Sequence, residues 1–447
     1  MSMFINRKDE IKKLIEIYNS KKPELVLLYG RRRVGKSRLL IESIKNYDAL
    51  YLLADMSENI LDVLSSQIKK EFVKFTNWDD FFEFIIKSKY KIIIIDEFQY
   101  LYNVDKAWLT ILQRWWEKIK ESDKKIILCG SILSTIYKIG IGYGSALYGR
   151  KTREMDITSL KFESVYEFLR NYNILDSIES YFILGGIPRY LEEFDTSQSV
   201  DYNIKKKIIE KTSFLYNEPM NLLFEEFRDS TPYISIILAI TEGKTKFNEI
   251  SDYSRISTNK LPKYLYTLER VKIIAKEYPV VGKKIRSKST HYTLIDNFYR
   301  FWFKFIFPNK SQIELGLKEE VFKDIRKNLN SFFGPVFEKL CVEVVLKSNI
   351  LMISKIGRWW HKDKEIDIVA IDDSKKEILF CECKWKEKVS AESVMKDLME
   401  KSRSVNYERN KEIFVVFAKS FKKKINEFEN RKVYCFDLKD IEKIMNK

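Results

Sequence analysis

One segment constrains this chain more than any other. Residues 24–37 read Glu-Leu-Val-Leu-Leu-Tyr-Gly-Arg-Arg-Arg-Val-Gly-Lys-Ser, and the last eight fit the phosphate-binding loop pattern G-x-x-x-x-G-K-[ST] without a mismatch. The apolar run before the loop predicts a strand buried on both faces, and the residues after it predict a helix. Gly30 and Gly35 let the backbone curl so that its N–H groups point at phosphate oxygens. The segment therefore predicts a nucleotide-phosphate site between a strand and a helix.

Residues of this loop are expected to bind ATP and Mg²⁺. Lys36 places a charge between the β- and γ-phosphates, and Ser37 offers a hydroxyl to Mg²⁺. We expect the whole loop and the residue after it to line the nucleotide: Gly30, Arg31, Arg32, Arg33, Val34, Gly35, Lys36, Ser37 and Arg38.

A second motif supports the first. Residues 91–98 contain four consecutive isoleucines followed by Asp96 and Glu97. This pattern predicts a buried strand that delivers two carboxylates to its carboxyl end, where ligands bind in open α/β sheets. Adjacent residues of a strand point to opposite faces, so the acids can hold different roles. We expect Asp96 to hold the Mg²⁺ and Glu97 to orient or deprotonate the attacking water. Alone, such a pair could cap a following helix.

Charge and cysteine content narrow the class of protein. Lys and Arg number 80 against 64 Asp and Glu, and the resulting net charge of +16 favours an anionic partner, with DNA ahead of a membrane. The alternative is a generally charged surface. Five cysteines without CxxC spacing argue against a disulfide scaffold or a zinc site. With no apolar signal region and no run long enough to span a bilayer, the sequence predicts a cytoplasmic protein.

Residues 1–160 alternate strand and helix signals. Expected strands are 25–29, 49–53, 92–95 and 126–129, and the helical segments between them predict a parallel α/β sheet. Ser131 follows the fourth strand and is expected near the γ-phosphate. Arg150 follows a glycine-rich loop and reaches a nucleotide, its own or a neighbour's, or is an ordinary surface arginine.

These pieces together resemble the archaeal-type ATPases of the AAA+ superfamily, in the branch close to the signal-transduction ATPases with numerous domains. Matching segments are the two motifs above, Phe-Ile-Asn-Arg at 4–7, Gly-Ser at 130–131, Leu-Tyr-Gly-Arg at 147–150 and Gly-Gly-Ile-Pro-Arg-Tyr at 185–190. The resemblance implies that the N-terminal segment and the Gly-x-Pro motif contact the adenine side. It therefore places Asn6, Arg7, Pro188 and Arg189 near the nucleotide. Many AAA+ proteins have Asn where this chain has Ser131. A homo-oligomer or a partner protein is compatible with this interpretation.

Two further segments follow the ATPase core. Residues 161–228 are helical in pattern and are expected to form a lid. Residues 229–298 predict helices at 234–240, 247–253 and 258–270, then strands at 273–280 and 291–294, which is a winged-helix order. Basic and aromatic residues on its third helix and wing could meet DNA phosphates: Lys260, Lys263, Tyr264, Arg270, Lys283, Lys284, Arg286 and Lys288. The alternative is a winged helix used for intramolecular contact.

Residues 299–447 hold a second candidate site. Residues 292–303 resemble the opening of an uncharacterised domain that often follows this ATPase core. A helix starting at Gly334, strands at 365–370 and 377–385, a helix at 391–404 and a strand at 413–417 follow the order of the restriction-endonuclease-like core. Asp367, Glu382 and Lys384 match its D…(E/D)-x-K pattern, and Glu338 matches its helix-borne acid.

The spacing of this second set agrees with metal-dependent cleavage. Period-2 alternation puts Glu382 and Lys384 on one face of their strand, with the cysteines on the core face. Asp367 and Glu382 are expected to bind Mg²⁺, and Lys384 to position the attacking water. The alternative is a structural ion-pair cluster on a decayed nuclease fold. The sequence thus predicts an α/β protein: a P-loop parallel sheet, a helical lid, a winged helix and a nuclease-like domain. It predicts an ATP-driven switch acting on DNA, or else a non-enzymatic, ATP-responsive regulator.

Overall fold

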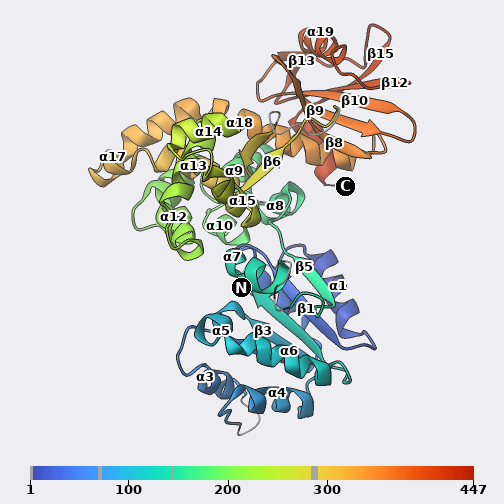
Figure 1. Ribbon diagram of the computed structural model, residues 1–447. Coiled ribbons are helices and arrows are strands. Elements are labelled where there is room, and N and C mark those ends of the chain that lie inside the picture. The colour runs from blue at the N-terminus through green and yellow to red at the C-terminus, as the bar shows by residue number, and fades with distance from the viewer. Residues whose placement is uncertain (1–3, 69–72, 143–144, 146, 283–289, 447) are drawn as a thin grey trace. The chain divides into compact units, whose positions relative to one another are not determined.

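The computed structural model describes residues 4–68, 73–142, 145, 147–282 and 290–446 (Figure 1). The chain divides into two compact units. The first unit comprises Met1–Ser159, Ile187–Arg189 and Leu222–Arg228. The second comprises Leu160–Gly186, Tyr190–Asn221 and Asp229–Lys447.

A five-stranded parallel sheet forms the centre of the first unit, in the order β2-β3-β4-β1-β5. The strands are β1 (Glu24–Tyr29), β2 (Ala49–Leu53), β3 (Ile92–Asp96), β4 (Lys125–Gly130) and β5 (Arg153–Asp156). The four predicted strands are confirmed. The fifth has no apolar run, because three of its four side chains are exposed at the sheet edge, and the sequence pattern did not reveal it.

Helices connect and cover these strands, which confirms the α/β fold class. They are α1 (Lys8–Tyr18), α2 (Lys36–Ser43), α3 (Ile60–Ser66), α4 (Trp78–Lys87), α5 (Gln99–Val104), α6 (Ala107–Ile119), α7 (Leu133–Ile136) and η1 (Tyr137–Ile141). Figure 1 shows α4, α5 and α6 beside the strands. Strands β1, β3 and β4 are buried along their whole length, as expected of central strands covered on both faces.

The middle of the chain is helical. Its elements before residue 229 are α8 (Phe162–Phe168), α9 (Ile174–Leu184), α10 (Pro188–Leu191), α11 (Val200–Asn203), η2 (Ile204–Ile209) and α12 (Phe214–Glu226). Next come α13 (Thr231–Thr241), α14 (Phe247–Ser254) and α15 (Leu261–Arg270), then the antiparallel pair β6 (Ile274–Glu277) and β7 (His291–Leu294). The predicted wing residues Lys283, Lys284, Arg286 and Lys288 lie outside the described residues.

A long helix links this region to the C-terminal sheet. After α16 (Asn297–Phe301), η4 (Trp302–Ile306) and α17 (Lys310–Glu314), α18 runs from Lys318 to Ser348 and contains Pro335. The prediction that a helix begins at Gly334 is therefore wrong. Proline removes one helical hydrogen bond and crowds the carbonyl four residues earlier, but the buried residues Val321, Ile325 and Leu329, spaced four apart, hold the preceding turns against the core.

Six strands form the C-terminal sheet, in the order β14-β15-β12-β10-β9-β8 (orange and red in Figure 1). Its elements are β8 (Lys355–His361), β9 (Lys364–Asp372), β10 (Glu377–Lys384), α19 (Ala391–Ser402), β12 (Lys411–Ala418), β14 (Glu427–Phe428), β15 (Arg431–Phe436) and α20 (Leu438–Met445), with β11 (Val389–Ser390) and β13 (Phe421–Lys423) pairing separately. Strand β9 is antiparallel to β8 and β10, and β12 is parallel to β10 and β15. The Phe380 face packs with Met395 and Leu398 of α19. Alternation puts Cys381 on the opposite face.

Candidate functional site

The loop between β1 and α2 has the geometry of a phosphate cradle. A Cβ on Gly30 would lie 2.2 Å from the Ile157 carbonyl oxygen, so this position accepts only glycine. Gly35 has φ 92°, a conformation that side chains rarely adopt. A Cβ on Gly35 would lie 3.9 Å from Cγ of Pro188. Pro188, singled out by the family resemblance, therefore lies beside the loop.

Two basic side chains support the loop backbone. The buried Lys36 donates from Nζ to the Arg31 carbonyl oxygen at 3.1 Å, so its ammonium lies inside the loop. Arg7 is also buried and donates to the carbonyl oxygens of Val34 (3.0 Å) and Thr158 (2.6 Å). Arg7 therefore braces the loop from the N-terminal segment.

The Tyr51 hydroxyl makes hydrogen bonds with both Asp96 and Ser37, so the three side chains lie close together. The Tyr51 hydroxyl donates to Oδ2 of Asp96 at 2.5 Å. Burial, then the Asp96 carboxylate, raises the pKa of Tyr51, whereas its hydrogen bond with Ser37 lowers it. Asp96 is fully buried, and its Oδ1 accepts from the Glu97 N–H at 2.9 Å. A carboxylate and two hydroxyls thus meet at the edge of β2 and β3.

Glu97 is held at the end of β3 in a fixed orientation. Its Oε2 accepts from the Ser131 hydroxyl at 2.6 Å and from the Gln99 amide at 2.5 Å. The Glu97 backbone has φ 54°, which is uncommon for a residue with a side chain. Ser131, directly after β4, and Gln99 therefore position the second acid of the motif together.

The oxygen set at this edge fits a magnesium ion. Asp96 and Ser37 supply hard oxygen donors of the kind Mg²⁺ uses beside substrate phosphates. Both belong to elements that meet at the carboxyl edge of the parallel sheet, next to the loop. These residues could hold the ion that ATP carries.

Arg150 lies at the end of the sheet opposite the phosphate-binding loop, near the amino end of β1. The Thr152 N–H donates to the Leu25 carbonyl oxygen, and Arg153 pairs with Val26. Arg150 is therefore near the amino end of β1, roughly 17 Å of strand from the loop. The prediction that Arg150 reaches the nucleotide of its own chain is wrong. Contact with a neighbour's nucleotide stays a prediction.

The other predicted nucleotide residues lie in the same unit. Arg32 donates to the Tyr100 hydroxyl at 2.8 Å and forms an ion pair with Glu225 at 2.8 Å. Val34 is buried within the loop. Contact with nucleotide stays a prediction for Asn6, Arg31, Arg32, Arg33, Val34, Arg38, Pro188 and Arg189.

The C-terminal residues fall into two groups. Glu382, whose side chain is buried, forms ion pairs through Oε1 with Lys384 (2.7 Å) and Lys401 (3.0 Å). Asp367 accepts from the Cys383 N–H at 2.8 Å, so its carboxylate lies beside the segment that carries the other two predicted residues. Burial raises the pKa of Asp367 to about 8, and Cys383 and Glu382 add to the shift.

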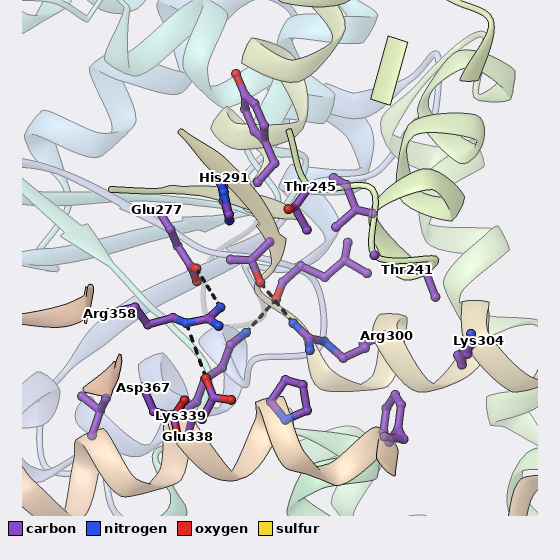
Figure 2. A pocket seen from close by; sticks show the side chains of 18 of the residues that line it. Thr241, Thr245, Glu277, His291, Arg300, Lys304, Glu338, Lys339, Arg358 and Asp367 are labelled. Carbon is purple, nitrogen blue, oxygen red and sulfur yellow. Dashed lines mark hydrogen bonds and ion pairs between the residues drawn. The ribbon is translucent and has the colours of Figure 1, made fainter. Parts of the chain in front are cut away.

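Asp367 and Glu338 share a cavity of about 720 Å³ that does not include Glu382 or Lys384 in its lining (Figure 2). One residue of β8, Arg358, lies opposite both Asp367 and Ile368 of β9. A bulge of this kind changes the direction of a side chain. Burial, then the charge of Asp367, raises the pKa of Glu338 to about 9.

Convergence of all four residues on one metal stays a prediction. Within the described ranges, no group of three or more His, Cys, Asp or Glu side chains could hold a metal ion. Any ion at Asp367 and Glu382 would need further ligands from the backbone or from a substrate.

Three features of these sites were not predicted. The tyrosine at position 51 lies in an apolar strand and carries no motif. Glu225 is far from its partner Arg32 in sequence. Arg300 and Lys339 line the cavity that Asp367 and Glu338 share, and only the fold brings their helices together. No helix in the described parts of the chain is long and apolar enough to cross a membrane.

Two family models match parts of this chain. Residues 4–194 match a family model described as an ATPase domain predominantly from Archaea. Residues 302–396 match a model described as Archaea bacterial proteins of unknown function. A Walker-type ATPase of Pyrococcus abyssi is 22% identical, with 67% of this chain and 96% of that chain covered and a TM-score of 0.48.

Two curated proteins of Methanocaldococcus jannaschii are similar in sequence. An uncharacterized ATP-binding protein is 48% identical over 44 residues, which cover 10% of this chain and 75% of that protein. A second, uncharacterized protein is 34% identical over 450 residues, which cover 98% of this chain and all of that protein. The chain therefore belongs to a family of proteins that join an ATPase domain found predominantly in Archaea to a C-terminal domain of unknown function.

Proposed function

We propose that the first unit binds ATP with Mg²⁺ and hydrolyses it. The observation that carries this proposal is the 2.6 Å hydrogen bond between Ser131 and Glu97 beside a complete phosphate-binding loop. It holds a carboxylate at the carboxyl edge of the sheet, where the γ-phosphate of a nucleotide on the loop would lie.

Each residue has a role that follows from its position. The loop N–H groups and Lys36 bind the phosphates, and Ser37 and Asp96 hold the metal ion. Bound Mg²⁺ would neutralise charge on the phosphate oxygens. Glu97 orients the attacking water and accepts its proton, and Ser131 keeps the carboxylate aimed.

Hydrolysis tests this proposal directly. Glu97→Gln should keep ATP binding but slow turnover by about 10²–10⁴-fold, because only the proton acceptor is removed. Glu117→Gln, an exposed acid of α6 in the same unit, is the matched control and should keep the wild-type rate. Equal rates in Glu97→Gln and the control would show that Glu97 is not the base. Absence of turnover in the wild type would favour a regulator that uses ATP as a ligand.

We further propose that the switch acts on DNA. In this proposal the ATPase core (1–160) and lid (161–228) control a winged helix (229–298) and a nuclease-like domain (299–447). Support comes from the charge of +16 and from basic residues on or beside α15: Lys260 and Lys263 are exposed, and the Arg270 guanidinium stacks 4.7 Å from the Tyr266 ring.

Metal-dependent cleavage is the second candidate function. It is favoured by the hydrogen bond that brings Asp367 to Cys383, between Glu382 and Lys384. Nicking of supercoiled plasmid with Mg²⁺ tests it, and Asp367→Ala should abolish nicking while leaving DNA retention in a gel shift. Glu377→Gln, at the other end of β10, is the control. If the wild type never nicks, the domain is a non-enzymatic scaffold.

A further inference from the structure

The cavity of the second unit contains two cations with neutral partners. Figure 2 shows Arg300 of α16 and Lys339 of α18 pointing toward the same stretch of β7. Arg300 donates to the Thr293 hydroxyl at 3.1 Å, and Lys339 donates to the Leu294 carbonyl oxygen at 2.7 Å. After this one hydrogen bond, each cation still has N–H groups that can donate to a ligand.

Acidic side chains of the wall act on this pair through their charge but form their ion pairs with another residue. The carboxylates of Glu277 and Glu338 pair instead with Arg358, at 3.6 and 3.5 Å. Among the described residues, neither Arg300 nor Lys339 has an ion pair with a carboxylate. Both cations are only partly exposed, and placing such charges away from bulk water is costly unless an anion accompanies them.

The cost is visible in the lysine itself. Burial, then the neighbouring Arg300, lowers the pKa of Lys339 to about 7. The cation end of the cavity therefore favours an anion.

The size and the lining of the cavity limit which class of molecule can carry the anionic group. A volume of about 720 Å³ is that of a small-molecule site rather than of a duplex groove. Beside the cations the wall carries aromatic rings from three elements, Tyr292 on β7, Phe305 on η4 and Phe332 on α18. An apolar or aromatic body fits such a wall, with the charged group at the cations.

We propose that this cavity binds a small organic anion, with its phosphate or carboxylate held by Arg300 and Lys339 and its apolar body against the aromatic wall. The site is separate from the phosphate-binding loop and requires neither ATP hydrolysis nor DNA cleavage. A ligand here would contact β7, α16 and α18 together, and so would stabilise their packing.

Three matched probes separate the ligand chemistries. Phenyl phosphate, benzoate and the neutral benzyl alcohol are titrated into the full-length protein at constant ionic strength, with binding followed by ligand-observed NMR. Excess ADP and Mg²⁺ are present throughout, which blocks the phosphate-binding loop. We expect saturable binding of at least one anion and at least about tenfold weaker binding of the alcohol, because one charge-assisted contact is worth about this much. Equal binding of all three, or of none, would overturn the proposal.

Substitutions of residues that line the cavity test whether the anion binds there. Arg300→Gln and Lys339→Met should each weaken the anion at least about tenfold. Ser331→Trp places a large ring at the exposed mouth of the cavity without changing a buried charge, and it should block binding even if Arg300→Gln fails to fold. Lys347→Gln, on the same helix but paired with Glu163, should bind as the wild type does. Unchanged affinity in Lys339→Met and Ser331→Trp would refute the site, whatever the outcome of the ATPase assays.

Discussion

The Tyr51 hydroxyl donates a hydrogen bond of 2.5 Å to Asp96, the acid expected to hold Mg²⁺. Tyr51 also bonds to Ser37, the other expected ligand of that ion. A protein hydroxyl therefore lies between the two groups that a bound metal must engage. We therefore expect this hydrogen bond to rearrange when Mg²⁺ binds, with Tyr51 competing with the ion for the same oxygens.

Tyr51→Phe should consequently strengthen Mg²⁺ binding in the presence of ADP. Removal of one competing hydrogen bond of about 1 kcal/mol corresponds to roughly a fivefold lower Mg²⁺ requirement. The metal-free variant should be destabilised by about 1–3 kcal/mol, because Oδ2 of the fully buried Asp96 loses the tyrosine hydroxyl. Calorimetric Mg²⁺ titrations and thermal unfolding measure both effects.

A nearby tyrosine supplies the control for this variant. Tyr47→Phe, on the loop before β2, removes a hydroxyl that contacts Asn19 and leaves Asp96 untouched. It should keep the wild-type Mg²⁺ requirement. A higher Mg²⁺ requirement in Tyr51→Phe would mean that the hydroxyl assists the metal instead of competing with it.

Lys36→Ala should remove most of the affinity for ATP. Lys36 has its ammonium inside the loop, and without it the β- and γ-phosphates have no cation there, an interaction worth about 1.5–3 kcal/mol or roughly 10–100-fold in affinity. Calorimetry with ATP measures the change. Lys45→Ala, just beyond α2 and paired with Glu42, should bind normally. Equal affinities in the two variants would place the nucleotide elsewhere.

Much of the first unit could be predicted because its signals are local. The strand ending at Tyr29, the loop and the acids after β3 are contiguous patterns, and the fold places them as buried parallel strands require. Arg150 was misplaced because adjacency to a glycine-rich loop says nothing about which sheet edge that loop occupies. Only the pairing of Arg153 with Val26 decides this.

The cavity of the second unit could not be predicted from local patterns. Arg300 and Lys339 are single basic residues on helices, a pattern typical of solvated faces, and three elements must pack before they meet. The bulge opposite Arg358 likewise turns Asp367 by a change in register that a period-2 pattern does not contain. Long-range packing, not local propensity, decides where the cavity lies and where Asp367 points.

DNA binding should depend on the basic face of α15. Replacing Lys260 and Lys263 with Ala should lower the slope of log affinity against log salt by about one unit for each phosphate that the protein no longer neutralises. Fluorescence anisotropy with a labelled duplex at several salt concentrations measures this slope. Replacing Lys422 and Lys423, exposed on β13, with Ala removes the same charge elsewhere and should leave the slope unchanged. Equal slopes for both double variants would exclude α15 from the interface.

Lys339→Met should stabilise the protein, and the gain should depend on pH. The pKa of Lys339 is about 7 when folded and about 10.4 when unfolded. Between these values the unfolded chain binds the extra proton, so the wild type gains stability as pH rises. Below pH 7 both states are charged and the full penalty remains. Methionine keeps the length of the side chain without its charge.

The difference between variant and wild type isolates this group from its neighbours. Arg300, Glu277, Asp296 and Glu338 contribute to the pKa of Lys339 and are present in both proteins. We expect a gain on the order of 2 kcal/mol at pH 6.5 that shrinks toward zero by pH 10. Thermal unfolding across this range measures it, with Lys347→Met as the control. A gain independent of pH would mean that the ammonium carries no penalty. A residue that destabilises the fold yet binds an anion is what a binding site, rather than a structural core, would contain.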